Sequence, residues 1–202
     1  MLTGVVLSGG RGRRFGREKG LVRLVSGPMA GVVVKTLRSV ADEVVISVAQ
    51  GMGEEYRALL GEDVVVVEDR LSGVGPLEGL TTALSVARGD YVIVSPCDTP
   101  LIRADVCRLL YERGRGRDGA VPRIRGYLEP LHASYRRDTS LSAFEEAKAN
   151  GRRRPKDAYA PLDLVIVEED EIRTLDPELD HFTNINTRED HEKVVARLSE
   201  RL

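Results

Sequence analysis

Glycines and basic residues gather in one stretch near the N-terminus, Val5–Lys19, which reads VVLSGGRGRRFGREK. Glycines let the backbone bend sharply and bring its N–H groups close to a ligand. The stretch also carries positive charge, on Arg11, Arg13, Arg14, Arg17 and Lys19. A predicted strand that leads directly into such a loop is suited to hold phosphate groups.

Acidic residues follow two later predicted strands. Asp69 comes after Val64–Val67, and Asp98 comes after Tyr91–Ser95. Ligands of an open parallel sheet bind beyond the carboxyl ends of its strands, so these residues are expected near the glycine-rich loop. Mg²⁺ takes one or two carboxylates together with phosphate oxygens, and we predict Asp98 as its ligand. The alternative role for Asp98 is a helix or turn cap ahead of Thr99-Pro100.

The N-terminal loop departs from two common phosphate-binding patterns. It lacks the Gly-Lys-Ser/Thr of a Walker A loop, and Phe15 replaces the third glycine of the dinucleotide pattern. It matches L-[AS]-G-G-x-x-x-R-[MF]-G-x-x-K and so resembles the signature of nucleotidyltransferases that use nucleoside triphosphates. The matching residues are Leu7, Ser8, Gly9, Gly10, Arg14, Phe15, Gly16 and Lys19. An arginine-rich surface turn is the alternative interpretation.

Strands and helices alternate along the first half of the chain. The predicted strands are Thr3–Leu7, Glu43–Ala49, Val64–Val67 and Tyr91–Ser95, and the predicted helices are Gly27–Val40, Gly53–Leu60, Pro76–Ala87 and Arg103–Arg113. This order predicts an α/β, Rossmann-like fold with a mostly parallel central sheet and helices on both faces. We expect one domain over residues 1–202, because no linker or repeat interrupts the chain.

The second half is less regular. We expect a strand pair at Gly119–Pro122 and Leu131–Tyr135, a helix at Thr139–Ala149, a strand at Leu164–Val167 and a C-terminal helix at Arg188–Leu202. The stretch Arg113–Arg125, which is rich in arginine and glycine, is expected to be a solvated loop.

Composition narrows the function classes. The 202 residues carry a net charge of −2, which gives no general attraction to nucleic acid or to acidic membranes. We expect neither a signal peptide nor a membrane span, and therefore a cytoplasmic protein. Cys97 and Cys107 are expected to be free thiols, and the cysteines and histidines do not have the spacing of a zinc site. We expect His132 to pack in the core and His181 and His191 to lie at the surface.

Five further motifs resemble, in the same order, those of molybdenum cofactor guanylyltransferases. They are GPLEGL (Gly75–Leu80), PCDTPLI (Pro96–Ile102), EPLHASYR (Glu129–Arg136), NGRR (Asn150–Arg153) and FTNINTRED (Phe182–Asp190). With the N-terminal signature they span nearly the whole chain. The resemblance implies a nucleotide-diphospho-sugar transferase-like fold. It also implies transfer of GMP from GTP to the terminal phosphate of molybdopterin, with release of pyrophosphate and with Mg²⁺ as cofactor.

The resemblance also implies roles for single residues. Arg14 and Lys19 would contact the triphosphate and act in catalysis with Asp98, which would bind Mg²⁺. Asn184 and Asn186 would lie near the active site. The implied nucleotide-binding residues are Leu7, Ser8, Gly9, Gly10, Arg14, Lys19, Asp69, Gly75 and Asp98. The implied partners are GTP, a molybdopterin-type phosphate acceptor and other proteins of molybdenum cofactor biosynthesis, and the implied assembly is a monomer or a small homo-oligomer.

The reaction needs no side-chain nucleophile, because the acceptor is already an anionic phosphate and the barrier is mainly electrostatic. One departure from the motifs is notable: Glu78 stands where alanine is usual, and it is expected to affect base or sugar contacts more than catalysis. Arg152-Arg153-Arg154 could bind the pterin phosphate or form a solvated loop. The alternative functions are an adenosylcobinamide-phosphate guanylyltransferase, a molybdopterin cytidylyltransferase, another small nucleotidyltransferase and a non-catalytic nucleotide-binding regulator.

Overall fold

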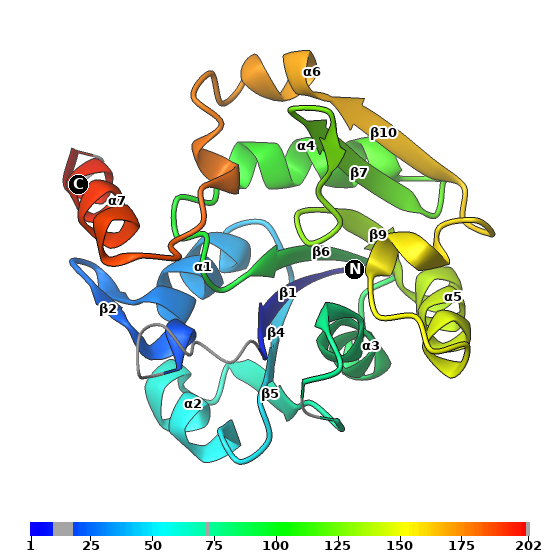
Figure 1. Cartoon of the computed structure of the whole chain (residues 1–202), viewed down its shortest axis with the longest axis horizontal. Coiled ribbons are helices and arrows are strands. Elements are labelled where there is room, and N and C mark those ends of the chain that lie inside the picture. Colours follow the sequence, from blue (N-terminus) through cyan, green and yellow to red (C-terminus); the bar gives the residue numbers. More distant parts are fainter. Residues whose placement is uncertain (10–17, 72, 201–202) are drawn as a thin grey trace.

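The computed structural model describes residues 1–9, 18–71 and 73–200. Within these residues the centre is a sheet of eight strands in the order β10-β7-β9-β6-β1-β4-β5, with β8 paired to β7 (Figure 1). The strands are β1 (Leu2–Ser8), β4 (Glu43–Val48), β5 (Val64–Glu68), β6 (Tyr91–Pro96), β7 (Gly119–Ile124), β8 (Tyr127–Leu128), β9 (Ser134–Arg136) and β10 (Leu164–Glu168). A separate short hairpin joins β2 (Arg23–Leu24) to β3 (Gly27–Pro28).

The sheet is mostly parallel, as predicted. Strand β1 pairs in parallel with both β4 and β6, and β4 pairs in parallel with β5. Strand β9 runs antiparallel to its neighbours β6 and β7, and β10 is again parallel to β7. The carboxyl ends of β1, β4, β5 and β6 therefore lie at the same edge of the sheet.

Helices cover both faces of this sheet. They are α1 (Met29–Arg38), α2 (Gly53–Leu60), α3 (Pro76–Val86), α4 (Ala104–Gly114), α5 (Arg137–Ala149), α6 (Glu169–Arg173) and α7 (Arg188–Glu200). The connections contain short 3₁₀ helices: η1 (Lys19–Leu21), η2 (Pro155–Ala158) and η3 (Asp180–Phe182). None of the helices in the described residues is long and apolar enough to cross a lipid bilayer.

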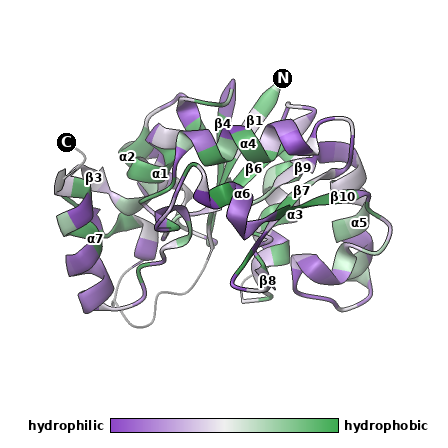
Figure 2. Ribbon diagram, turned by 90° about the horizontal axis from the view of Figure 1, so that it is seen from above, coloured by the Kyte–Doolittle hydropathy of each residue, from purple (hydrophilic) through white to green (hydrophobic). Residues whose placement is uncertain are grey.

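Neighbouring residues of β1 show how the two faces are filled. Val6 packs in a hydrophobic cluster with side chains of α1, α2, α4 and α6, whereas Val5 packs in a second cluster with side chains of α3 and α5. Successive side chains of a strand point to opposite faces, so the two clusters lie on opposite sides of the sheet. The predicted helices on both faces are thus confirmed. Figure 2 shows the hydrophobic colour running through the central strands and purple, hydrophilic segments along α7.

A third cluster ties the C-terminal part of the chain to the N-terminal half. It joins Leu24 and Met29 to Leu101, Ile185 and Val194. Figure 1 shows the corresponding arrangement, with α7 beside β2 and at the end of the molecule that carries α1. The segment before α7 is thereby held against the loop that follows β6.

Two predictions about local structure are wrong. Arg113–Arg125 is not one solvated loop, because Gly119–Ile124 forms β7 between β9 and β10. The strand expected at Gly119–Pro122 is confirmed and reaches Ile124, and pairing on both edges satisfies its backbone N–H and C=O groups. The four valines of Val64–Val67 predict a buried strand, but β5 lies at the edge of the sheet and Val65 is 39% exposed.

Candidate active site

Described residues that follow β1, β5 and β6 meet at the carboxyl edge of the sheet and line a cavity of about 730 Å³. Two further segments complete its walls, one before β9 and one before α7. The lining residues are Leu7, Gly9, Lys19, Asp69, Leu71, Gly73, Gly75, Pro76, Gly79, Pro96, Cys97, Asp98, Glu129, Pro130, Leu131, His132 and Asn184. This volume is in the range of small-molecule sites.

Lys19 joins three separate parts of the sequence in the cavity wall. Its Nζ atom lies 2.8 Å from Asp98 Oδ2 and donates a 2.7 Å hydrogen bond to Asn186 Oδ1. The side chains of Lys19 and Asp98 are only 18% and 19% exposed. A cation that is mostly withdrawn from water interacts more strongly with charges in the cavity than a surface lysine does.

Backbone hydrogen bonds hold these parts in register. The N–H of Cys97 donates to the carbonyl of Leu7 (3.0 Å), which fixes the loop after β6 against the end of β1. The N–H of Ile185 donates to the carbonyl of Asp98 (2.8 Å) and places Asn184 and Asn186 on either side of that bond. The sheet and these two bonds position Asp98 independently of its side chain.

Asp69 lies beside the glycine loop. Its carboxylate accepts a hydrogen bond from Ser47 Oγ, and a Cβ atom on Gly9 would overlap its Oδ2 atom. A Cβ on Gly79 would lie 3.3 Å from Asp69 Oδ1, so both glycines leave room for this carboxylate. Burial raises the pKa of Asp69, and burial near Asp69 raises the pKa of Glu18 to about 7. Asp69 lines the cavity, and its carboxylate can accept hydrogen bonds from a ligand there.

Ser8 and Gly20 pack behind the cavity wall that carries Lys19 and Cys97. Ser8 is buried, and its Oγ atom lies 2.5 Å from Tyr56 Oη and 3.2 Å from Cys97 Sγ, so its side chain is used inside the protein. A Cβ on Gly20 would overlap Tyr56 Oη, so glycine is needed for the turn that presents Lys19. Burial raises the pKa of the Cys97 thiol to about 12, which keeps this sulfur neutral.

The opposite wall was not predicted. Glu129 and His132 line it, and neither was predicted as a site residue. His132 is buried, as expected, and burial lowers its pKa to about 3, so the ring is neutral. His181 was expected at the surface but is 1% exposed, and its ring packs against those of His132 and Phe182. Its Nδ1 atom accepts a hydrogen bond from the Arg103 N–H, so burial is compensated by a partner.

The structure brings most of the predicted site residues together. Leu7, Gly9, Lys19, Asp69, Gly75, Asp98 and Asn184 line the cavity, and Asn186 binds Lys19 at its edge. Gly75 has a φ of 101°, a conformation that favours glycine. Gly10 and Arg14 lie outside the described residues, as do the neighbouring arginines of the loop. His191 is partly exposed, and its Nε2 atom lies 3.0 Å from the carbonyl of Arg23.

Comparison with known structures defines the class of protein to which this fold belongs. The fold matches that of 2-C-methyl-D-erythritol 4-phosphate cytidylyltransferase from Thermus thermophilus with a TM-score of 0.73 at 16% identity, over 100% of both chains. A stronger match is molybdopterin-guanine dinucleotide biosynthesis protein A from Archaeoglobus fulgidus, with a TM-score of 0.83 and 28% identity over 98% of this chain and 99% of that chain. The architecture is that of nucleotidyltransferases, as predicted.

The family follows from sequence. Residues 4–167 match the model of the MobA-like NTP transferase domain. A probable molybdenum cofactor guanylyltransferase from Methanosarcina mazei is 34% identical over 99% of this chain and 92% of the relative. A relative of the same name from Thermococcus kodakarensis is 38% identical over 94% and 92%. The chain belongs to the MobA-like NTP transferase family.

Proposed function

We propose that this protein transfers GMP from GTP to the terminal phosphate of molybdopterin and releases pyrophosphate. An oxygen of the acceptor phosphate forms a bond to the α-phosphorus of GTP, and the bond from that phosphorus to the bridging oxygen of the β-phosphate breaks. The family and the names of the relatives support this reaction. No residue of the protein needs to form a covalent intermediate.

The observation that carries the proposal is the contact of Lys19 with Asp98 and Asn186. It brings the N-terminal signature, the PCDTP motif and the NINT motif to one partly buried cation. Two anionic phosphates must approach one another in this reaction, and charge grows on the leaving pyrophosphate. A fixed cation that is shielded from water stabilises that charge without reorganisation of solvent.

The donors of the site fit a magnesium ion. Asp98 supplies a carboxylate to the cavity, and Asn184 also lines it. No group of three or more His, Cys, Asp or Glu side chains that could hold a metal is found within the residues that the structure describes. This agrees with Mg²⁺ chemistry, in which phosphate oxygens and water complete a site of one or two carboxylates. Bound there, Mg²⁺ would neutralise phosphate charge, while Asp98 holds it in place.

The remaining walls divide between the two substrates. Asp69 and the adjoining glycines suit the nucleoside of GTP, whose ribose hydroxyls and base N–H groups donate hydrogen bonds to a carboxylate. We assign the acceptor to the wall formed by Glu129, Leu131 and His132. We further propose that the protein works in the cytoplasm, where the buried free thiols of Cys97 and Cys107 would stay reduced.

The test is a transfer assay with GTP labelled at the α-phosphate, Mg²⁺ and purified molybdopterin. The expected products are labelled molybdopterin guanine dinucleotide and pyrophosphate, with much less product from CTP or ATP. Cobinamide phosphate serves as a competing acceptor. Preferred transfer to cobinamide phosphate, or preferred use of CTP, would replace the proposal by the corresponding alternative. Nucleotide binding without turnover on any acceptor would favour a regulator.

A further inference from the structure

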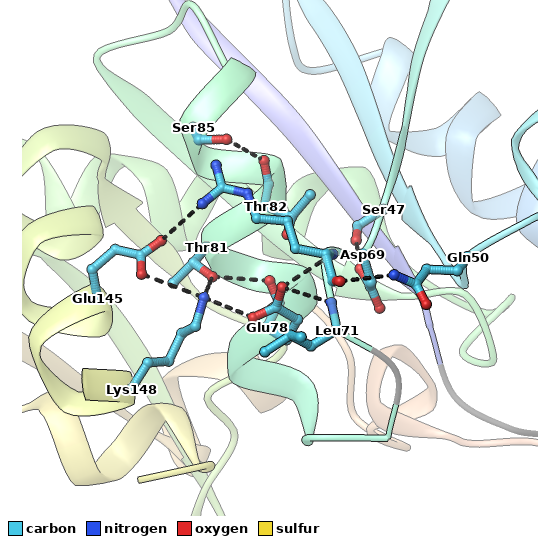
Figure 3. A network of polar contacts seen from close by, with 11 residues as sticks. Ser47, Gln50, Asp69, Leu71, Glu78, Thr81, Thr82, Ser85, Glu145 and Lys148 are labelled. Carbon is cyan, nitrogen blue, oxygen red and sulfur yellow. Dashed lines mark hydrogen bonds and ion pairs between the residues drawn. The ribbon is translucent and has the colours of Figure 1, made fainter. Parts of the chain in front are cut away.

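Glu78 does not reach the nucleotide cavity, although its position in GPLEGL suggested that it would. It is 2% exposed and is not among the residues that line the cavity, and its carboxylate belongs to a polar network with Leu71 and Lys148 (Figure 3). Its Oε1 atom accepts hydrogen bonds from the backbone N–H groups of Arg70 (3.1 Å) and Leu71 (3.2 Å). Glu78 occupies the third position of α3, where a carboxylate is also favoured by the helix N-terminus.

The two N–H groups belong to the part of the loop that immediately follows Asp69. Asp69 and Leu71 both line the cavity, so the carboxylate of Glu78 fixes backbone between two wall residues. The Arg70 peptide is held from the other side too, because Gln50 Nε2 donates a 2.7 Å hydrogen bond to its carbonyl. Asp69 itself is anchored by Ser47 and by its own N–H, which donates to the Val48 carbonyl (2.8 Å).

Lys148 of α5 supplies the charge that allows Glu78 to be buried. Its Nζ atom lies 2.7 Å from Glu78 Oε2 and donates a 2.8 Å hydrogen bond to Thr81 Oγ1 (Figure 3). A second carboxylate on α5, that of Glu145, has its Oε2 atom 3.3 Å from Lys148 Nζ, and its side chain is 40% exposed. Without Lys148 the buried carboxylate of Glu78 would lack a cation, and burial of a charge without a partner is costly.

We propose that Glu78 and Lys148 form a positioning pair that holds the Asp69–Leu71 loop in the conformation that binds the nucleoside part of GTP. The pair acts through the backbone of the loop and touches neither substrate. Its role rests on the proposed function in one respect only, the identity of the nucleotide. Loss of the pair weakens GTP binding and leaves the chemical step, which depends on Lys19 and Asp98, almost unchanged.

The first experiment compares Glu78→Ala with Glu78→Gln in steady-state kinetics at saturating acceptor. In Glu78→Ala the loop loses two hydrogen bonds to a charged acceptor, so KM for GTP should rise about tenfold while kcat falls less than about threefold. Glu78→Gln keeps an oxygen that can accept both N–H groups, and it should restore most of the wild-type KM.

Glu68→Ala is the matched control. Glu68 also accepts two backbone hydrogen bonds, from Gly51 and Gly53 at 2.9 Å each, but none of these three residues lines the cavity. Its loss should lower thermal stability without changing KM for GTP. An equal rise of KM in Glu68→Ala would mean that loosening any loop at this edge has the same effect, and it would overturn the specific role of Glu78.

The double variant Glu78→Ala/Lys148→Ala separates positioning from stability. It leaves no unpaired buried charge, so it should fold even where Lys148→Ala alone does not. We expect KM for GTP to stay raised, because the N–H groups of Arg70 and Leu71 still lack their acceptor. A wild-type KM in a stable double variant would reduce the pair to a structural ion pair and overturn the proposal.

Amide hydrogen exchange tests the same idea without any nucleotide. Exchange at Arg70 and Leu71 should become faster in Glu78→Ala and stay at the wild-type rate in Glu68→Ala. Unchanged exchange at both amides in Glu78→Ala would refute the positioning role. If the wild-type protein failed to use GTP, this result would still stand, so failure of the proposed function and failure of the positioning pair can be told apart.

Discussion

Asp98→Asn is the substitution that tests the candidate site most directly. Asparagine keeps the shape of the side chain and removes its negative charge. The loop should stay in place, because the Leu7–Cys97 and Asp98–Ile185 contacts are made by backbone atoms. The change therefore isolates the charge that faces Lys19 at 2.8 Å and, in the proposed function, the charge that holds Mg²⁺.

The expected effects on stability and on turnover differ in size. Loss of a charge-assisted hydrogen bond costs about 1.5–3 kcal/mol, and Lys19 keeps Asn186 as a partner, so the lower end applies. For a chain of this length about 1.5 kcal/mol corresponds to a decrease in Tm of roughly 3–6 °C. Turnover should fall about 10²–10³-fold, as for other losses of one electrostatic group at a reacting centre.

The assay is pyrophosphate release with GTP and molybdopterin over a range of Mg²⁺ concentrations, at a temperature well below the Tm of the variant. Asp90→Asn is the control, since Asp90 is 79% exposed and pairs with the N-terminal amine. We expect wild-type kinetics in the control and a raised Mg²⁺ requirement in Asp98→Asn. Turnover within about threefold of wild type, with the same dependence on Mg²⁺, would refute the role assigned to Asp98.

Three further predictions concern single residues. Lys19→Met should lower kcat about 100-fold in the same pyrophosphate assay, whereas Lys35→Met, on an exposed part of α1, should not; equal losses would argue for a general charge effect. Gly20→Ala should lower the free energy of unfolding by about 1–3 kcal/mol in urea titrations, because its Cβ overlaps Tyr56 Oη; wild-type stability would contradict this. His132 has a pKa of about 3 in the folded state, so stability should fall as pH drops below about 6.5, where the unfolded chain takes up the proton. His132→Gln should reduce that slope by up to about 1.4 kcal/mol per pH unit, and an unchanged slope would assign it to other groups.

The sequence predicted the positions of the strand ends well because the strands of the first half are apolar runs that break off abruptly. Val5, Val6 and Leu7 lead into glycine, and Tyr91–Ser95 leads into Pro96 and Asp98. A break of this kind needs no tertiary information, since a change from buried apolar residues to glycine, proline or aspartate marks the edge of a sheet. The placement of those ends brings Leu7 beside Pro96 and Cys97, at the edge of the sheet where Asp98 lies.

Spacing along the chain could not predict the direction of individual side chains. Glu78 lies in the first turn of α3, so it could have pointed to the cavity or to the loop behind it; its partner Lys148 is supplied by a helix much later in the chain. His181 likewise has a polar sequence around it, and its burial depends on His132 and Arg103 from distant elements. Such choices are made by packing between elements, which local patterns do not contain.

The candidate site depends on the register of β6 against β1 more than on any local motif. Leu7 pairs with Pro96, and backbone bonds close the pairing at both ends, from Asp90 to Met1 (3.0 Å) and from Cys97 to Leu7 (3.0 Å). A slip of one residue would move Asp98 by about 3.3 Å along the strand direction. The hydrogen bond from Lys19, now 2.8 Å, would then be lost, and so would the bond from Ile185 that places the two asparagines. The three motifs meet at one cation only in this register, so correct pairing of β6 with β1 is a condition for forming the site.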